Sequence, residues 1–312
     1  MKIALIFPGQ GSQFVGMGKD FCDKFDAARS IYRELDKILN RKLSNLIFNG
    51  NEEELSNTTN SQPSIMATSI AIYQVLITHD LLNHDLITCV AGHSLGEYSA
   101  LVANKSLSFA DSVKLLDIRS KAMQDSMPIG TGAMAAVIGK SEDEINDLVL
   151  SLQSHGKIYI ANDNAIGQIV LSGEAKAIDF LCQNSKDLGV KRAIKLPVSA
   201  PFHCELISNA SLKLKEEIEN FDFHDFALPL YSNVTAKQCD NSLIKDLLVE
   251  QIISKVKWRE SVENMINDGI NLFIEIGPGN ILTNLVKRAS KDLDTISISK
   301  VEDLEKLYNI KK

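Results

Sequence analysis

Two hydrophobic patterns alternate along the chain. Short, nearly continuous apolar runs of strand length are separated by longer stretches in which apolar residues recur every three or four positions. The runs that we predict as strands are 3–7, 87–91, 133–138, 158–161, 169–172, 193–196, 230–232 and 272–276. The stretches that we predict as helices are 15–39, 62–82, 97–104, 109–126, 205–219, 243–254 and 259–268. This alternation favours a parallel sheet that is covered by helices on both faces.

The middle of the chain follows a different order. It reads strand, helix (141–153), two strands, helix (174–188) and a final strand. This β-α-β-β-α-β order is that of a ferredoxin-like unit. We therefore predict a ferredoxin-like subdomain at residues 130–197, inserted into an α/β core that is made of residues 1–129 and 198–312.

The composition is that of an ordinary globular protein. Of 312 residues, 45% are hydrophobic and 23% are charged, as in typical soluble domains. The net charge is -7 and the basic residues are scattered, so nothing indicates a nucleic acid or an anionic membrane as partner. The polar segment 49–60 is interpreted as a solvated loop.

Cysteine usage and the N-terminal segment indicate the compartment. Five widely spaced cysteines show no zinc spacing, which predicts free thiols in a reducing environment and no bound metal. The apolar run 3–7 is too short for a signal peptide or a membrane span. We therefore expect a cytoplasmic protein.

One five-residue motif carries the strongest chemical signal. Gly92-His93-Ser94-Leu95-Gly96 fits G-x-S-x-G, with a predicted strand before it and a predicted helix after it. So tight a bend brings backbone segments close together, which only glycine permits at both flanks. The bend would present the serine hydroxyl at a helix N-terminus, where negative charge is favoured, and would place the Leu95 N–H as an oxyanion donor. The alternative is a glycine-rich turn with an incidental serine.

A serine nucleophile needs a base, and the sequence offers several histidines. His93 adjoins the serine, but neighbouring side chains in an extended turn point apart. His79 and His84 lie in a polar segment and are expected in solvent. His203 lies between a predicted strand and a predicted helix, in a stretch that two prolines stiffen. On these residues alone, a structural role for His203 and a role as base are equally consistent.

A second glycine-rich loop follows the first predicted strand. Residues 8–13 read Pro-Gly-Gln-Gly-Ser-Gln, and Phe14 stands where a dinucleotide fingerprint would need glycine or alanine. A dinucleotide site is therefore disfavoured. The amide of Gln10, between two glycines, is instead a candidate second oxyanion donor. The alternative is a tight turn without chemistry.

Arg119 lies on an apolar stripe of the predicted helix 109–126. The residues that share its face are Leu115, Leu116, Ala122 and Met123. An arginine in such a place is buried or lines a cleft, and needs an anionic partner. That partner is either an internal carboxylate or the carboxylate of a substrate, which the guanidinium fork suits well.

Taken together, these motifs resemble those of malonyl-CoA:acyl carrier protein transacylases. The matching segments are 7–13, 62–63, 92–100, 119, 130–136, 198–204, 251, 256–258 and 275–279. The resemblance spans residues 3 to about 290. It implies an α/β-hydrolase-like core with a parallel sheet plus an inserted ferredoxin-like subdomain. It also implies transfer of malonyl from malonyl-CoA to the phosphopantetheine thiol of acyl carrier protein for fatty acid biosynthesis, without a metal or another cofactor.

The resemblance also assigns roles to individual residues. It implies Ser94 as the nucleophile and His203 as the base. It implies the N–H groups of Gln10 and Leu95 as the oxyanion donors, and Arg119 as the anchor of the malonyl carboxylate.

Further residues bear on orientation and specificity. The resemblance implies that the backbone carbonyl of Gln251 orients the catalytic histidine, and His93 is similar to a residue near the bound acyl group. Phe202 departs from many stand-alone bacterial members, which have serine there, and resembles malonyl-selective domains of polyketide synthases. The polyketide acceptor therefore stays open as an alternative, beside a serine thioesterase or esterase of related fold and a non-catalytic carrier-binding module.

Overall fold

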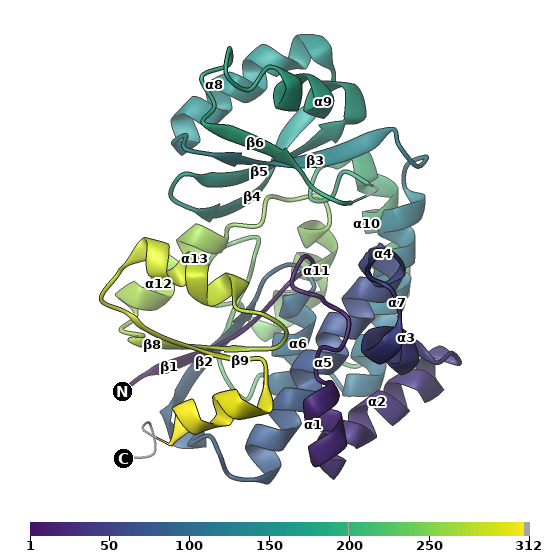
Figure 1. Ribbon diagram of the computed structural model, residues 1–312, viewed down its shortest axis with the longest axis vertical. Coiled ribbons are helices and arrows are strands. Elements are labelled where there is room, and N and C mark those ends of the chain that lie inside the picture. Colours follow the sequence, from purple (N-terminus) through teal and green to yellow (C-terminus); the bar gives the residue numbers. More distant parts are fainter. Residues whose placement is uncertain (199, 309–312) are drawn as a thin grey trace.

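The computed structural model describes residues 1–198 and 200–308 and consists of a larger and a smaller α/β part (Figure 1). The strands are β1 (Ile3–Phe7), β2 (Ile87–Gly92), β3 (Gly132–Ile138), β4 (Ile158–Ala165), β5 (Gln168–Glu174), β6 (Arg192–Lys195), β7 (Leu230–Tyr231), β8 (Leu272–Ile276) and β9 (Asp294–Ile298). The α-helices are α1 (Lys19–Lys24), α2 (Asp26–Leu39), α3 (Leu43–Asn49), α4 (Glu52–Ser56), α5 (Thr58–Thr78), α6 (Gly96–Ala103), α7 (Phe109–Asp125), α8 (Glu142–Leu152), α9 (Ala175–Gln183), α10 (Ser208–Ile218), α11 (Ile244–Gln251), α12 (Trp258–Asn267) and α13 (Ile281–Ala289). Among these described helices, none combines the length and the hydrophobicity that crossing a membrane requires.

The larger part is built on a parallel sheet with the order β7-β2-β1-β8-β9. All residues of the central strand β1 are buried. Ile3, Leu5 and Phe7 pack into one hydrophobic cluster with α2, α5 and α7, whereas Ala4 and Ile6 pack into another with α12 and α13. Successive side chains of a strand point to opposite faces, so helices cover both faces of the sheet. This confirms the expected α/β core.

The smaller part contains the antiparallel sheet β4-β5-β3-β6. Buried residues of α8 and α9 pack with this sheet into a third hydrophobic cluster. Strand order and direction are those of a ferredoxin-like unit, and Figure 1 shows this part above the core. The limits that we set at 130–197 stay a prediction, as do the flanking core ranges, of which residues 199 and 309–312 lie outside the described residues.

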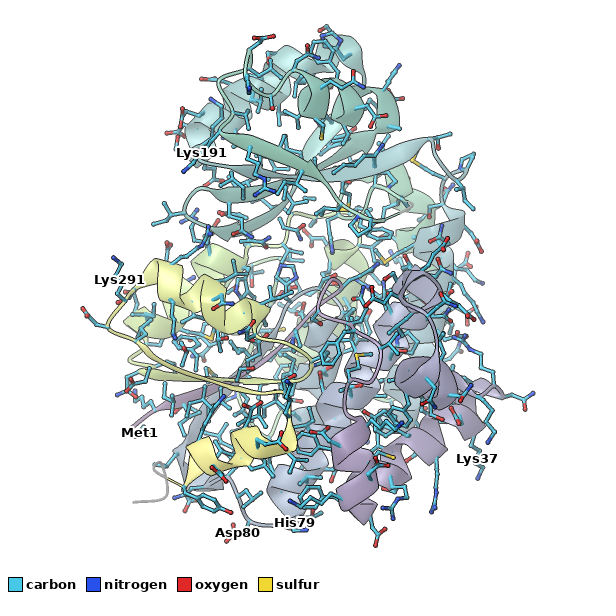
Figure 2. The ribbon with its side chains drawn as sticks, viewed as in Figure 1. Met1, Lys37, His79, Asp80, Lys191 and Lys291 are labelled. Carbon is cyan, nitrogen blue, oxygen red and sulfur yellow. The ribbon has the colours of Figure 1, made fainter. Side chains whose placement is uncertain are left out.

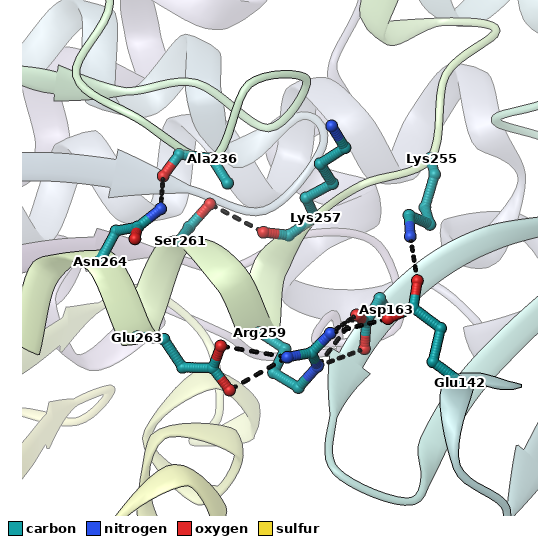
Figure 3. A network of polar contacts seen from close by, with 9 residues as sticks. All are labelled: Glu142, Asp163, Ala236, Lys255, Lys257, Arg259, Ser261, Glu263 and Asn264. Carbon is teal, nitrogen blue, oxygen red and sulfur yellow. Dashed lines mark hydrogen bonds and ion pairs between the residues drawn. The ribbon is translucent and has the colours of Figure 1, made fainter.

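The smaller part is fastened to the core along β4. The Val256 N–H donates to the carbonyl of Ala161, and the Asp163 N–H donates to the carbonyl of Val256, at 2.8 and 2.9 Å. The Asp163 side chain is 1% exposed and accepts hydrogen bonds from Arg259 at 2.7 and 3.0 Å. Glu142 at the start of α8 accepts from the same guanidinium at 2.9 Å (Figure 3). We call the ion pairs of Asp163, Arg259 and Glu142 the β4 clasp.

Several elements differ from those predicted. The single helix expected at 15–39 is divided into α1 and α2, because Phe25 takes an extended conformation. The expected loop at 49–60 is wrong: it contains α4 and the start of α5. The Asn51 side chain caps α4 by accepting from the Glu54 N–H, and glutamates in the first turn favour the helix. Helix α13 and strand β9 were not predicted.

Candidate active site

Ser94 lies on the bend between β2 and α6. Its φ is 52°, a left-handed conformation that a residue other than glycine rarely adopts. A Cβ on Gly92 would lie 1.9 Å from the carbonyl carbon of Gly96, and one on Gly96 would lie 2.2 Å from the oxygen of Phe7. Both flanking positions therefore require glycine, as the motif led us to expect. The bend holds the Ser94 hydroxyl away from the strand and toward the core's cleft.

The imidazole of His203 faces this hydroxyl. Its Nε2 lies 2.8 Å from the Ser94 Oγ, and its Nδ1 lies 2.8 Å from the backbone oxygen of Gln251. A carbonyl oxygen can only accept, so Nδ1 carries the proton and Nε2 is left to accept one from the serine. Burial, and then the charge of Arg119, lowers the pKa of His203 to about 3. The ring is therefore neutral near pH 7 and able to act as a base.

Two backbone N–H groups near the serine have no hydrogen-bond acceptor among the described residues. They belong to Leu95, directly before α6, and to Gln10, in the loop after β1. The two loops are in contact, because the His93 N–H donates to the Phe7 carbonyl at 3.0 Å and a Cβ on Gly9 would lie 2.6 Å from the His93 oxygen. Free amides on adjoining loops beside a nucleophile form the arrangement that stabilises an oxyanion.

Arg119 projects from α7 to the same place and is 0% exposed. Its guanidinium donates to the Oε1 atoms of Gln62 and Gln251 at 2.7 and 2.8 Å and to the Ser94 Oγ at 3.0 Å. Within the described part of the chain, no carboxylate forms an ion pair with it. The internal ion pair that we considered as an alternative is thus absent from these residues. A buried positive charge with only neutral partners is costly and favours an incoming anion.

A cleft with a volume of about 150 Å³ opens above the serine. Ser94, His203 and Phe202 line it from the core, and Met134 and Asn162 line it from the smaller part. Phe202 is 5% exposed and its ring is part of the wall, while its role beside an acyl group stays a prediction. The site therefore lies between the two parts, a frequent place for ligand sites.

Two other histidines point or lie elsewhere. The His93 Nε2 lies 2.8 Å from the Asn164 Oδ1 of β4, and burial lowers the pKa of His93. His93 therefore joins the cleft wall to the smaller part and leaves the serine to His203. His79 lies at the end of the molecule opposite Lys191 of the smaller part (Figure 2).

Three polar side chains at the site were not predicted. Asn233 braces the bend, because its Oδ1 accepts from the Ser94 N–H at 2.6 Å and its Nδ2 donates to the Gly92 carbonyl at 2.7 Å. The Gln251 side chain donates to the Ser94 carbonyl at 3.1 Å and to the Glu97 carboxyl at 2.5 Å. Of the three, only Glu97 could have been found from the sequence, because a carboxyl group on an apolar helix needs buried hydrogen-bond partners.

One acidic cluster outside the cleft has the residue types of a metal site. The carboxylate oxygens of Glu142, Asp163 and Glu260 lie within 4.8 Å of one another. Two of these carboxylates belong to the β4 clasp and already accept from Arg259. Ion pairing thus accounts for two of the three carboxylates, and the expectation that no metal takes part stays a prediction.

Fold and site together are typical of α/β enzymes that act through a serine. The family model described as "Acyl transferase domain" matches residues 4–306. The chain therefore belongs to the acyl transferase domain family and, within it, to the malonyl CoA-acyl carrier protein transacylases.

Named relatives support this placement. The malonyl CoA-acyl carrier protein transacylase of Bacillus subtilis is 44% identical over 97% of this chain and 95% of its own length. The solved acyl-carrier-protein-S-malonyltransferase of Bartonella henselae is 41% identical with a TM-score of 0.95, and the match covers 99% of both chains. A malonyl-transacylase solved in complex with a type II PKS acyl-carrier protein is 35% identical with a TM-score of 0.94, covering 99% of this chain and 100% of that one.

Proposed function

We propose that this enzyme moves a malonyl group from malonyl-CoA to the phosphopantetheine thiol of acyl carrier protein through an ester on Ser94. The observation that carries the proposal is the buried guanidinium of Arg119, which lacks a carboxylate partner in the described residues and lies 3.0 Å from the Ser94 Oγ. It suits the free carboxylate at the far end of a malonyl group whose thioester carbon is at the serine. The family membership supports the same substrate and partner.

The first step forms the ester. The His203 Nε2 takes the proton from the Ser94 Oγ while this oxygen attacks the thioester carbon of malonyl-CoA. The negative charge that develops on the carbonyl oxygen is received by the N–H groups of Gln10 and Leu95. The carbon–sulfur bond then breaks, and the coenzyme A sulfur leaves with the proton that the imidazole returns.

The second step reverses these roles with a new thiol. His203 takes the proton from the phosphopantetheine thiol, whose sulfur attacks the ester carbon. The carbon–oxygen bond breaks, and the Ser94 Oγ recovers its proton from the imidazole. Throughout both steps Arg119 holds the malonyl carboxylate away from the reacting carbon, so the cargo keeps one orientation.

Intact mass spectrometry tests this sequence directly. After malonyl-CoA is added, the chain should gain the mass of one malonyl group, and Ser94→Ala should gain none. Addition of carrier protein should remove the group from the enzyme and load it on the carrier. An ester that still forms in Ser94→Ala would refute the nucleophile. An ester lost to water as fast as to the carrier would favour the thioesterase alternative.

We propose a fatty acid carrier as the acceptor, with a type II polyketide carrier as the second candidate. The second candidate is favoured by the Phe202 ring in the cleft wall, together with a structural relative bound to a type II PKS acyl-carrier protein. Comparing kcat/KM for the two kinds of carrier separates these acceptors. We place the reaction in the cytoplasm, since all five cysteines are free thiols.

A further inference from the structure

The carboxyl group of Glu97 lies beneath the serine bend and takes no part in the two steps above. It belongs to the first turn of α6 and is 1% exposed. Its neighbours along this helix, Tyr98 and Ser99, are also buried. A buried carboxyl is costly unless it is bonded, so its partners indicate what it is for.

The partners of Glu97 connect it to the guanidinium of Arg119. The Glu97 Oε2 accepts from the Gln251 Nε2 at 2.5 Å and from the Asn233 backbone N–H at 3.5 Å. The same Gln251 Nε2 donates to the Ser94 carbonyl at 3.1 Å. Gln251 then turns its Oε1 toward Arg119, which donates to it at 2.8 Å.

A carboxylate can only accept hydrogen bonds, so it fixes which way the Gln251 amide points. The NH2 group must face Glu97 and Ser94, and the oxygen must face Arg119. If the amide turned over, its NH2 group would meet the guanidinium, and two donors would oppose each other. The acid and the Ser94 carbonyl thus together determine which group of the Gln251 amide faces the arginine.

The separation of the two charges is equally informative. Glu97 and Arg119 are one amide apart and form no ion pair. Burial raises the pKa of Glu97 to about 7, while the hydrogen bonds from Gln251 and Asn233 and the charge of Arg119 act in the opposite direction. The carboxylate is near enough to hold the amide, yet it leaves the guanidinium free to bind a substrate anion.

We infer that Glu97 is a positioning residue for acyl-group selection, which acts through the Gln251 side chain to keep Arg119 aimed at the acyl end of the cleft. The inference rests on the proposed function, in which Arg119 binds the malonyl carboxylate. Glu97 itself touches neither the substrate nor the reacting atoms.

Glu97→Gln tests the inference with almost no change in size. The new amide can meet Gln251 in either orientation, so only the Ser94 carbonyl still orients Gln251 and the acceptor of Arg119 is held less firmly. We expect kcat/KM for malonyl-CoA relative to acetyl-CoA to fall about tenfold or more, mainly through a higher KM for malonyl-CoA. The assay is run at about pH 8, where the wild-type carboxyl is ionised. If Glu97 had a purely structural role, the substitution would lower kcat/KM for both substrates by the same factor.

Glu275→Gln is the matched control. Glu275 of β8 is a carboxyl with 0% exposure that accepts from the backbone N–H groups of Leu282 and Thr283. Its bonds go to α13 and not to the arginine. Its replacement should lower stability and leave the malonyl-to-acetyl ratio unchanged.

A second variant tests the same inference in case Glu97→Gln fails to fold. Gln251→Met keeps the backbone carbonyl but removes the amide, and it should lower the same ratio as Glu97→Gln does. In an Arg119→Ala background, Glu97→Gln should change the ratio no further. If Arg119→Ala keeps the malonyl preference, the proposed anchor is wrong. If Arg119→Ala loses it while Glu97→Gln and Gln251→Met retain the wild-type ratio, the present inference alone is overturned.

Discussion

Replacing Arg119 with alanine should convert a malonyl-selective enzyme into one that prefers neutral acyl groups. The guanidinium is fully buried, and its N–H groups point at Gln62, Gln251 and Ser94. Acetyl-CoA presents no carboxylate and gains nothing from this charge. The substitution therefore removes an interaction that only one of the two substrates makes.

The size of the effect follows from the donors involved. A guanidinium offers two parallel N–H groups to a carboxylate, and each charged hydrogen bond is worth about 1.5–3 kcal/mol. Their sum of about 3–6 kcal/mol corresponds to about 150-fold to about 25,000-fold in kcat/KM. The free enzyme already satisfies these donors with neutral acceptors, so part of the gain is offset on binding. We therefore expect about 100-fold for malonyl-CoA and at most about threefold for acetyl-CoA.

The assay is the rate of carrier loading from each thioester, measured for the wild type, Arg119→Ala and Arg119→Lys. Lysine keeps the charge but loses the planar fork, so it should fall between the other two. Urea unfolding of each variant checks that the fold is intact. An alanine variant that keeps the wild-type malonyl preference would refute the reasoning, because no other buried cation faces the serine among the described residues.

Three further predictions concern the base, the clasp and the bend. Burial holds the pKa of His203 at about 3, below its ordinary 6.5. The neutral ring therefore contributes its full share to the unfolding free energy above pH 6.5, and this share declines as the pH falls toward 3. Between about pH 7.5 and about pH 5, urea titrations should show the wild type losing about 2 kcal/mol more than His203→Asn, and equal losses would contradict a buried neutral ring. Asp163→Asn should cost about 1.5–3 kcal/mol in unfolding free energy, because Arg259 loses its buried carboxylate partner and keeps only the more exposed Glu142 and Glu263, and a change below about 1 kcal/mol would show that the clasp behaves as a surface ion pair. Gly92→Ala should abolish ester formation because its Cβ would overlap the backbone of α6, whereas Gly130→Ala, with a φ of 86° but open space, should keep activity in the mass assay and cost only about 1–2 kcal/mol.

Local signals were enough for the main elements of the fold. The short apolar runs predicted the strands of both sheets except β9, because a buried strand needs near-continuous apolar residues. The order of elements between β3 and β6 predicted the small antiparallel sheet. Helix α4 could not be found this way, since its five residues carry almost no apolar pattern and depend on a cap by Asn51.

Only the site residues that belong to a sequence motif could be predicted. Ser94 and His203 stand in recognisable segments, and the structure brings them within 2.8 Å, although their roles stay predictions. No sequence motif predicts the contacts of Asn233 and of the Gln251 side chain. Their partners are 139 and 154 positions away in the chain, and polar side chains at such separations meet only through the tertiary fold.

The central position of β1 has a consequence for how the chain matures on the ribosome. Ile3 pairs with Ile87 on one side and with Leu272 on the other. One edge of β1 must therefore wait until Leu272 and the rest of β8 have been translated before its neighbour is available. During that interval an apolar strand with unpaired amides is open to wrong partners, so we expect newly made chains to rely on chaperones more than the finished enzyme's compact sheet would suggest.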